Sequence, residues 1–384
     1  MSYRSRPVRL AVVSGPAYDP LYEHLARSGV ACEIGFRGDH PSLNRHLASF
    51  GAELPYEVVS THTKYAPAQA AQLAPLDELI AADALADFVP RLLELARVSN
   101  RLLGLPRNLD ARLLHYRTDL TSLPATWDAL FDTSRRLKQS GLCATPFVFP
   151  GMESGLFGTF YELCEMAGAE LFPADGGPRI QNAGGEWALE LLRTCVHEGL
   201  APSAAKGWHY DRVHEYFRAG HAAFVGDWPG YYAFYRDRSQ CPVSDRIALA
   251  PYPLGPAGKS LAYAGAHTFA LTHAGARSAE ALRVLQFLTA PEQQSFEARR
   301  GFVPVRMSVM AEIQAESSGA ELERLRALQT VSQHQVVIPP KLAVYPEIED
   351  TIWHHVQDAI FGDTDVKSAL AAITSRIETI LRTS

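Results

Sequence analysis

The sequence has few cysteines, and none of them lies close to another. The five cysteines among 384 residues are odd in number, and neither a CxxC pair nor histidines at zinc-finger spacing accompany them. A disulfide framework is therefore not indicated. Most of these thiols are expected to behave as small buried apolar side chains. They are Cys32, Cys143, Cys164, Cys195 and Cys241.

Long apolar runs and concentrated positive charge are also missing. No stretch approaches the roughly 20 apolar residues that a membrane-spanning helix needs. The 36 lysines and arginines are scattered and the formal net charge is −6, so nucleic acid is not an expected partner. The apolar stretch "LAVV" near the N-terminus is too short for a secretory signal. We expect that export is encoded in residues missing here, or that the protein stays inside the cell.

The usual motifs of nucleotide-dependent and metal-dependent enzymes are absent. The sequence contains no GxGxxG after its first expected strand, no GxxxxGK[ST] and no HExxH. The segment "GMESG" at residues 151–155 resembles a nucleophile elbow, but its serine is displaced from the middle of a GxSxG pattern. We therefore expect neither a cofactor nor a metal ion, and no enzymatic activity.

The composition is that of a folded globular protein, and the chain is too long for a single hydrophobic core. Hydrophobic residues make up 47% and charged residues 20% of the chain, which is normal for globular proteins. A single core rarely grows beyond about 250–300 residues. Two lobes are expected.

The order of patterns indicates an α/β fold. Apolar strands are expected at residues 8–13, 30–38 and 56–63, with amphipathic helices at 18–29 and 40–53 between them. This βαβαβ order is typical of a parallel sheet covered by helices.

The segments that follow predict more helices and two crossings between lobes. Residues 68–98 read as strongly helical with interruptions at Pro75 and Pro90, and residues 106–110 read as a polar turn between two strands. We place the first crossing at that turn and the second near residue 260, after a proline-rich and glycine-rich linker. Thr126 is the expected N-cap of a helix that ends at Gly141.

Five stretches in this order resemble a known family. They are "YAPAQAAQLAPLDELI", "LLHYRTDL" followed by "PATWDAL", "YFRAGHAAFVGDWPG", "AYAGAHTFALTHAGARSAEALRVLQFLTAPEQQ" and "GFVPVR". Together they make the chain similar to the family 1 extracellular solute-binding proteins of ABC importers, which include maltose-binding-protein-like sugar receptors.

The resemblance implies a two-lobed periplasmic-binding-protein-like fold. Each lobe is expected to hold a mixed, mostly parallel sheet flanked by helices. Residues 1–109 and 261–310 would form the N-terminal lobe, and residues 110–260 and 311–384 the C-terminal lobe.

The resemblance also implies a function. The protein would capture a sugar, oligosaccharide or polyol in a cleft between the lobes, close about a hinge and deliver the solute to a membrane permease. It would act outside the cytoplasm, as a monomer.

The turn "GDWPGYY" at residues 226–232 supplies the first candidate ligand contacts. A sugar offers apolar C–H faces to aromatic rings and hydroxyls to polar groups. By the resemblance, Trp228 is the best single candidate for a stacking platform, with Tyr231 in support. The alternative is that Trp228 fills a corner of the core.

Polar candidates lie at the end of the third strand and at the two crossings. His62 and Tyr65 follow the third strand, where ligands of parallel sheets gather. Tyr263, Gly265 and His267 lie at the return crossing, where Gly265 would allow a ligand to approach the backbone. A structural histidine or a hinge segment are the alternatives.

Three further residues complete the candidate set. Asp110 at the first crossing is an expected hydroxyl acceptor, Glu153 stands at a helix start, and Arg306 could present its guanidinium to the ligand. Each has an ordinary alternative. Asp110 could form a turn, Glu153 could interact with the helix dipole, and Arg306 could form a surface ion pair.

Two other classes of function stay open. A cytoplasmic ligand sensor on the same fold agrees with the missing signal, and a sugar-acting transferase would also hold sugars between two lobes. Turnover of a bound sugar would distinguish the transferase from the receptor.

Overall fold

The chain divides into two compact units in the computed structural model, which describes residues 6–174 and 176–383. Unit 1 contains the described residues up to Asp110 together with Gly265–Ser317 and Pro340–Tyr345. Unit 2 contains Ala111–Ala264, Ser318–Pro339 and the described residues from Pro346 onward. The lobe boundaries expected from the sequence stay a prediction.

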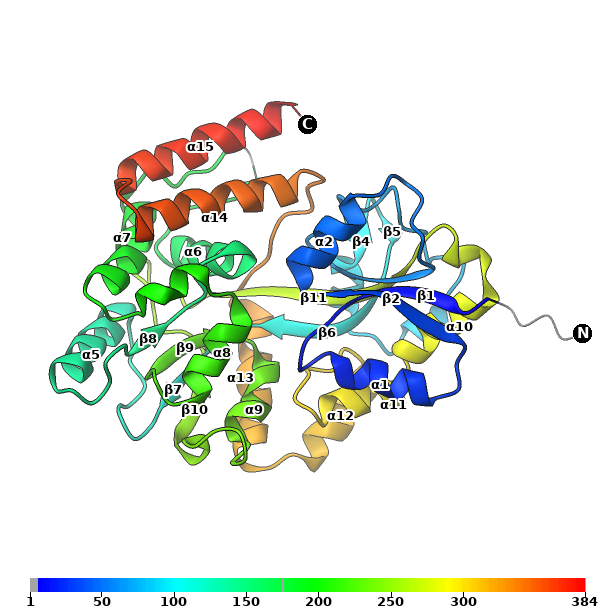
Figure 1. The fold of residues 1–384 in the computed structure, drawn as a ribbon, viewed down its shortest axis with the longest axis horizontal. Helices are drawn as coiled ribbons and strands as arrows, with labels where there is room; N and C mark the ends of the chain where they lie inside the picture. The colour runs from blue at the N-terminus through cyan, green and yellow to red at the C-terminus, as the bar shows by residue number, and fades with distance from the viewer. Residues whose placement is uncertain (1–5, 175, 384) are drawn as a thin grey trace, which may run out of the picture. The chain divides into compact units, whose positions relative to one another are not determined.

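Unit 1 holds the elements from β1 to most of β6 and a later group made of most of β11 and three helices (Figure 1). Its elements are β1 (Val8–Val13), α1 (Asp19–Arg27), β2 (Cys32–Gly38), α2 (His40–Ala48), β3 (Val58–His62), α3 (Ala82–Leu85), α4 (Pro90–Leu95), β4 (Arg97–Val98), β5 (Arg101–Leu102), most of β6 (Leu105–Ala111), most of β11 (Ala262–Leu271), α10 (Ala279–Leu288), α11 (Pro291–Ala298) and α12 (Met307–Glu316).

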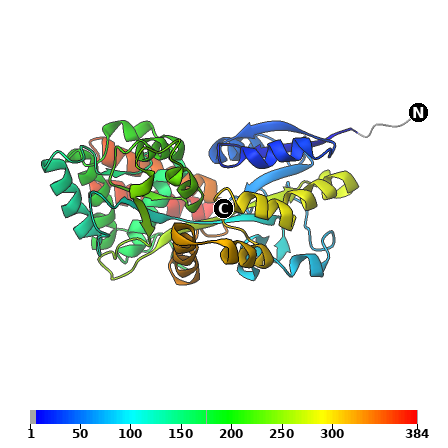
Figure 2. The ribbon, with the colours of Figure 1, turned by 90° about the horizontal axis from the view of Figure 1, so that it is seen from below.

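The sheet of unit 1 has helices on both faces. Its strands run in the order β2-β1-β3-β11, with β6 also paired to β11; β1 is parallel to β2 and β3, whereas β11 is antiparallel to β3. Because side chains alternate along a strand, Val8, Leu10 and Val12 of β1 pack with α1 and α10, and Ala11 and Val13 pack with α2. Figure 2 shows α1 as the blue helix beside these strands.

Unit 2 contains the middle of the chain and its last helices. Its elements are β7 (Leu113–Arg117), α5 (Trp127–Gln139), β8 (Phe147–Val148), α6 (Glu153–Met166), α7 (Ala183–His197), α8 (Tyr210–Arg218), β9 (Phe224–Asp227), the 3-10 turn η2 (Pro229–Tyr231), α9 (Tyr232–Arg236), β10 (Ile247–Ala250), α13 (Gly319–His334), β12 (Val336–Val337), most of α14 (Tyr345–Phe361) and α15 (Val366–Thr383).

The sheet of unit 2 runs in the order β10-β7-β9-β8. Only β8 and β9 pair in parallel, whereas β7 is antiparallel to both of its neighbours, so this sheet is less parallel than we expected. Thr126 caps α5 as predicted, because its side chain accepts a hydrogen bond from the Ala129 N–H. Within the described residues, no helix is both long enough and apolar enough to cross a membrane.

Two local predictions are wrong. Residues 68–98 contain only the short helices α3 and α4, because the Ala74 and Leu76 N–H groups bond to distant carbonyls of Leu271 and Leu102 instead of to a helix. Residues 106–110 are not a turn but part of the continuous strand β6. The polar side chains of β6 are buried or nearly so, and Arg107 and Asn108 donate to the carboxylates of Glu297 and Asp110, which the sequence pattern did not reveal.

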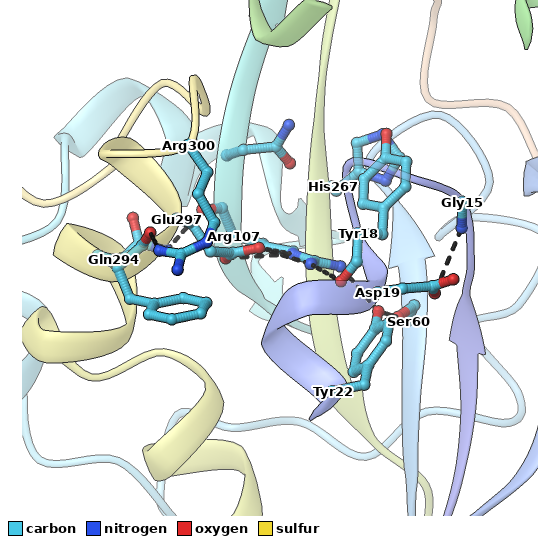
Figure 3. Close-up of polar contacts among 12 residues, drawn as sticks. Gly15, Tyr18, Asp19, Tyr22, Ser60, Arg107, His267, Gln294, Glu297 and Arg300 are labelled. Carbon is cyan, nitrogen blue, oxygen red and sulfur yellow. Dashed lines mark hydrogen bonds and ion pairs between the residues drawn. The ribbon is translucent and has the colours of Figure 1, made fainter. Parts of the chain in front are cut away.

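A buried ion pair anchors β6 to α11 (Figure 3). The Arg107 guanidinium donates to Glu297 at 2.6 Å, to the Tyr22 hydroxyl at 2.7 Å and to the Tyr18 carbonyl at 3.3 Å. The Arg107 and Glu297 side chains are 1% and 4% exposed. Glu297 holds the pKa of Arg107 above its ordinary value, although burial opposes this. The network fixes α1 and α11 on the sheet.

We predict that Glu297→Gln destabilises unit 1 by about 3–5 kcal/mol, because it leaves a buried guanidinium without its counter-charge. Urea unfolding followed by circular dichroism measures this loss. The control is Glu316→Gln, which breaks the exposed pair with Arg299 and should change the unfolding free energy by no more than about 1 kcal/mol. Equal effects of the two substitutions would contradict the assignment.

Candidate functional site

Three histidines of unit 1 meet at one end of its sheet. His62 is the last residue of β3, His267 is its partner on the antiparallel strand β11, and His40 begins α2. The ring centroids lie 5.1 Å apart for His40 and His62, 5.2 Å for His62 and His267, and 4.4 Å for His40 and His267. We call these three side chains the imidazole cluster.

The His267 ring has polar partners at one nitrogen and no hydrogen bond at the other. Asp110 Oδ2 lies 3.6 Å from His267 Nε2, and the Tyr18 hydroxyl lies 3.1 Å from the same atom. Asn108 in turn donates to Asp110 Oδ2 at 2.6 Å. His267 Nδ1 is buried and makes no hydrogen bond. The Tyr18 hydroxyl therefore holds Nε2 with the Asp110 carboxylate beside it, while Nδ1 makes no hydrogen bond within the described residues.

The His62 ring occupies space that Gly265 leaves open. A Cβ atom at Gly265 would lie 2.3 Å from His62 Cε1 and 2.5 Å from Nε2, closer than side chains approach one another. On its other nitrogen, His62 Nδ1 accepts the Lys64 N–H at 3.1 Å. Gly265 therefore makes room for a histidine, and its expected role in ligand approach stays a prediction.

Burial keeps these imidazoles neutral near neutral pH. It lowers the pKa of His62 and that of His267 well below the ordinary value, since a charged imidazole loses its hydration there. The neighbouring His40 and Lys64 lower both pKa values further. A neutral imidazole offers one donor and one acceptor nitrogen.

Tyr65 borders the imidazole cluster. Its ring centroid lies 6.3 Å from that of His62 and 5.7 Å from that of His40, and the Lys64 ammonium lies 4.6 Å from the Tyr65 ring. The structure thus brings five predicted site residues together in unit 1. They are His62, Tyr65, Asp110, Gly265 and His267.

Unit 2 contains a separate aromatic cluster around Trp228. Trp228 follows β9 directly, is only partly buried, and has ring-centroid distances of 5.5 Å to Tyr210 and 6.0 Å to Tyr263. We call Trp228, Tyr210 and Tyr263 the aromatic cluster. Tryptophan is rarely fully buried even in a core, so the role of Trp228 as a stacking platform stays a prediction beside the corner-filling alternative.

A buried arginine lies behind this aromatic cluster. Arg112 Cζ is 5.9 Å from the Trp228 ring and 6.0 Å from the Tyr263 ring, and the guanidinium pairs with Glu162. Glu162 also accepts the Tyr263 N–H at 2.9 Å, which fixes Tyr263. Arg112 Nη1 and the Tyr210 hydroxyl are buried and make no hydrogen bond. Two buried polar atoms without a hydrogen-bond partner thus lie beside the three aromatic rings.

Tyr231 belongs to a neighbouring stack. Its ring lies 3.3 Å from that of His214, whose Nδ1 is 2.6 Å from Asp227 Oδ2. The Tyr231 hydroxyl donates to Asp211 at 3.3 Å. Support of Trp228 by Tyr231 stays a prediction, since Tyr210 and Tyr263 are the rings that contact Trp228.

Glu153 has an unusual backbone. As the first residue of α6 it has φ +51°, a left-handed conformation that residues other than glycine rarely adopt. Such strain costs about 1–3 kcal/mol and gathers at functional positions. The observation supports the prediction that Glu153 serves a ligand.

Arg306 contacts residues outside the imidazole cluster. Its Nε donates to the Thr289 carbonyl at 2.7 Å, its Nη1 lies 3.4 Å from Asp87, and its guanidinium covers the Phe88 ring at 4.0 Å. These partners give Arg306 a structural role between α12 and the segment before α4. Its contact with a ligand stays a prediction that these observations do not favour.

Two residues of the clusters, His40 and Tyr210, and the adjoining Arg112 were not among the predicted site residues. His40 lies just after the end of β2, as His62 lies at the end of β3, so the rule about strand ends could have found it. Arg112 lies between β6 and β7 and carries no local signal. Tyr210 begins α8 in an aromatic-rich segment, which is a weak signal.

The two clusters offer different chemistry. The imidazole cluster and Asp110 supply acceptors and one-proton donors, whereas the aromatic cluster supplies apolar faces next to donors of Arg112 and Tyr210. Each kind of group suits a hydroxylated small molecule.

The family assignment follows from the comparisons. Residues 49–295 match the family model described as bacterial extracellular solute-binding protein, which is more than half of the chain. The chain therefore belongs to the family of bacterial extracellular solute-binding proteins.

Two curated relatives match part of the chain. A Deinococcus radiodurans protein named "Probable ABC transporter-binding protein" is 26% identical over 230 residues, which are 57% of this chain and 54% of that protein. A Pseudomonas aeruginosa protein named "Mannitol-binding protein" is 29% identical over 210 residues, which are 50% of this chain and 47% of that protein. The matched part of the chain thus spans about half the length of these curated relatives.

Solved structures confirm the expected fold class. A maltose-bound protein of T. maritima has a TM-score of 0.86 at 22% identity and covers 97% of this chain and 100% of its own. An ABC transporter solute-binding protein of Agrobacterium radiobacter, in complex with ribitol, has a TM-score of 0.85 at 18% identity and covers 98% of this chain and 99% of its own. At these identities the likeness establishes the fold.

We predict that Gly265→Ala displaces the His62 ring and lowers the free energy of unfolding by about 1–3 kcal/mol, since the added methyl group overlaps the imidazole. Urea unfolding and the histidine NMR signals measure both effects. Gly51→Ala is the control, because a Cβ at Gly51 meets nothing within 4 Å. An unchanged His62 signal in Gly265→Ala would refute this packing.

Burial also gives His115 a measurable effect on stability, because it lowers the pKa of this side chain to about 4. Between pH 6.5 and 4 the unfolded state binds a proton that the folded state does not, so falling pH favours unfolding, by up to about 3 kcal/mol from this group. We predict that His115→Phe flattens the decline in stability between pH 7 and pH 4.5 in urea titrations. The exposed His354→Gln substitution should leave the wild-type slope, and equal slopes for all three proteins would contradict this prediction.

Proposed function

We propose that the protein is the substrate-binding receptor of an ABC importer. It captures a small hydroxylated solute, a sugar, oligosaccharide or polyol, and delivers it unaltered to a membrane permease. It acts outside the cytoplasm, has no enzymatic activity and works as a monomer. The family membership and the names of the relatives, which mention mannitol, maltose and ribitol, support this proposal.

The observation that carries the proposal is the aromatic cluster with its unused donor. Trp228, Tyr210 and Tyr263 offer ring faces to the apolar side of a sugar or polyol. Arg112 Nη1 is buried beside them without a hydrogen bond, a costly state for a charged group unless a ligand supplies an acceptor. Because Glu162 already neutralises Arg112, the remaining N–H fits a neutral hydroxyl better than an anion.

The polar residues of unit 1 support the same class of ligand. Neutral imidazoles at His62 and His267 and the carboxylate of Asp110 can accept hydrogen bonds from hydroxyls. Tyr65 adds an aromatic face beside His62. Closure of the lobes on the solute, which the family resemblance implies, stays a prediction that X-ray scattering with and without ligand can test.

A thermal-shift screen against sugars and polyols tests the proposal, because a ligand that binds only the folded state raises the melting temperature. Trp228→Ala should weaken binding of any hit by at least about tenfold, since a buried ring face contributes more than about 1.4 kcal/mol. The control is Trp353→Ala on α14, whose ring stacks on His354 and lies outside the aromatic cluster. Retained affinity in Trp228→Ala would remove this residue from the site, and turnover of a hit would exclude a pure receptor.

A further inference from the structure

We propose that His40, His62 and His267 form a binding site for one divalent transition-metal ion, with Zn²⁺ as the best-suited ion. One nitrogen from each imidazole lies within 4.8 Å of the others. The site lies wholly within unit 1. It goes beyond the proposed capture of a hydroxylated solute and does not depend on it.

The geometry of the three rings suits a shared ion. Zn–N bonds of about 2.0–2.1 Å at tetrahedral angles separate ligand nitrogens by roughly 3.4 Å. Nitrogens that already lie within 4.8 Å of each other reach this spacing through small rotations of their side chains. The His40 and His267 rings are stacked with an interplanar angle of 29°, and each is steeply inclined to the His62 ring, at 76° and 79°, so His62 faces the shared point from a different direction than the other two.

The surroundings of His267 resemble those of a metal-binding histidine. Metal ligands among histidines usually have their other nitrogen held by a carboxylate, which orients the ring and makes it more basic. Asp110 Oδ2 lies 3.6 Å from Nε2, and Tyr18 lies 3.1 Å from it. The opposite nitrogen, Nδ1, is buried without a hydrogen bond, so it is free to bind an ion.

His62 is held in place before an ion arrives. The Lys64 N–H donates to its Nδ1, and the absent side chain of Gly265 leaves room for the ring edge. His40 adds the third ligand from the N-terminus of α2, where the Asp39 side chain caps the helix and fixes its first turn. Preorganised ligands lower the entropic cost of binding an ion.

The local charges permit a cation. Two cationic side chains lie near the imidazole cluster, and each has its own partner: Arg107 pairs with Glu297, and the Lys64 ammonium lies over the Tyr65 ring. Asp110 supplies a negative charge beside His267. Three imidazole nitrogen ligands favour zinc, cobalt, nickel or copper over calcium or magnesium.

Three protein ligands leave at least one coordination position open. Structural zinc sites have four protein ligands, whereas sites with three hold a water molecule or another oxygen ligand in the fourth position. The expectation that the protein binds no metal ion relied on short sequence motifs. These three histidines come from distant parts of the chain, so no such motif could reveal them.

Isothermal titration of the full chain without a polyhistidine tag, after treatment with EDTA, tests the site. We expect one equivalent of Zn²⁺ to bind, and the visible spectrum of the Co²⁺-loaded protein to show the intense bands of a four-coordinate site. His62→Ala and His267→Ala should each weaken Zn²⁺ binding at least tenfold, whereas His354→Ala, which removes an exposed histidine of α14, should not. Absence of a stoichiometric site, or equal affinity in all four proteins, would overturn the proposal.

Two further variants distinguish loss of the metal site from unfolding of the protein. Asp110→Asn should weaken Zn²⁺ binding by about 10–100-fold as a positioning residue and change the Co²⁺ spectrum, while its circular dichroism stays that of the wild type. His40→Ala removes the least buried ligand and is expected to keep the fold. If His40→Ala and Asp110→Asn fold and bind Zn²⁺ with wild-type affinity, the site is refuted.

The solute screen separates this proposal from the proposed function. EDTA-treated protein that responds to sugars or polyols but not to Zn²⁺ overturns the metal site alone. Protein that binds Zn²⁺ at these histidines but responds to no solute supports the metal site and contradicts the sugar or polyol receptor.

Discussion

The pairing register of β11 against β3 is the constraint on which the unit 1 site depends. His267 lies opposite His62 in this antiparallel pair, and the two strands are far apart in the sequence. A shift by one residue would turn every side chain of β11 to the other face of the sheet. It would separate His267 from His62 and place a side chain where Gly265 now leaves room for the His62 ring. The fully buried character of β11 opposes such a shift.

The strongly periodic start of the chain was predictable, and so was part of this site. The first three strands and two helices follow from apolar periodicity, and the rule about strand ends selected His62. His267 was selected because it lies at the predicted second crossing, but its contact with His40 depends on a long-range pairing that no local pattern encodes. The same limit explains the wrong helix at residues 68–98, where backbone hydrogen bonds of Ala74 and Leu76 go to remote strands.

Buried polar pairs hold the side chains next to the aromatic rings of unit 2 in fixed positions. Arg112 and Glu162 lie behind Trp228 and Tyr263, and Asp227 ties His214 and Tyr235 together next to Tyr231. Such pairs add little net stability but are specific in geometry, because a misplaced partner leaves an uncompensated charge. Sequence periodicity identifies the helices and the strand that carry Glu162, His214 and Asp227 as partly apolar, and for that reason assigns them apolar neighbours. The buried polar pairs were therefore not predictable from the pattern.

Under the proposed function, the two clusters would recognise hydroxyls in different ways. Rings beside a neutralised guanidinium favour a solute that is apolar on one face and carries hydroxyls on its edge. Buried imidazoles whose pKa values are lowered can accept hydrogen bonds from hydroxyls directly, or they can hold an ion whose open position takes an oxygen atom. Both uses need the same neutral nitrogens. An ion at these histidines would therefore compete with direct hydrogen bonding to the solute, and would replace it with a metal–oxygen contact at the same residues.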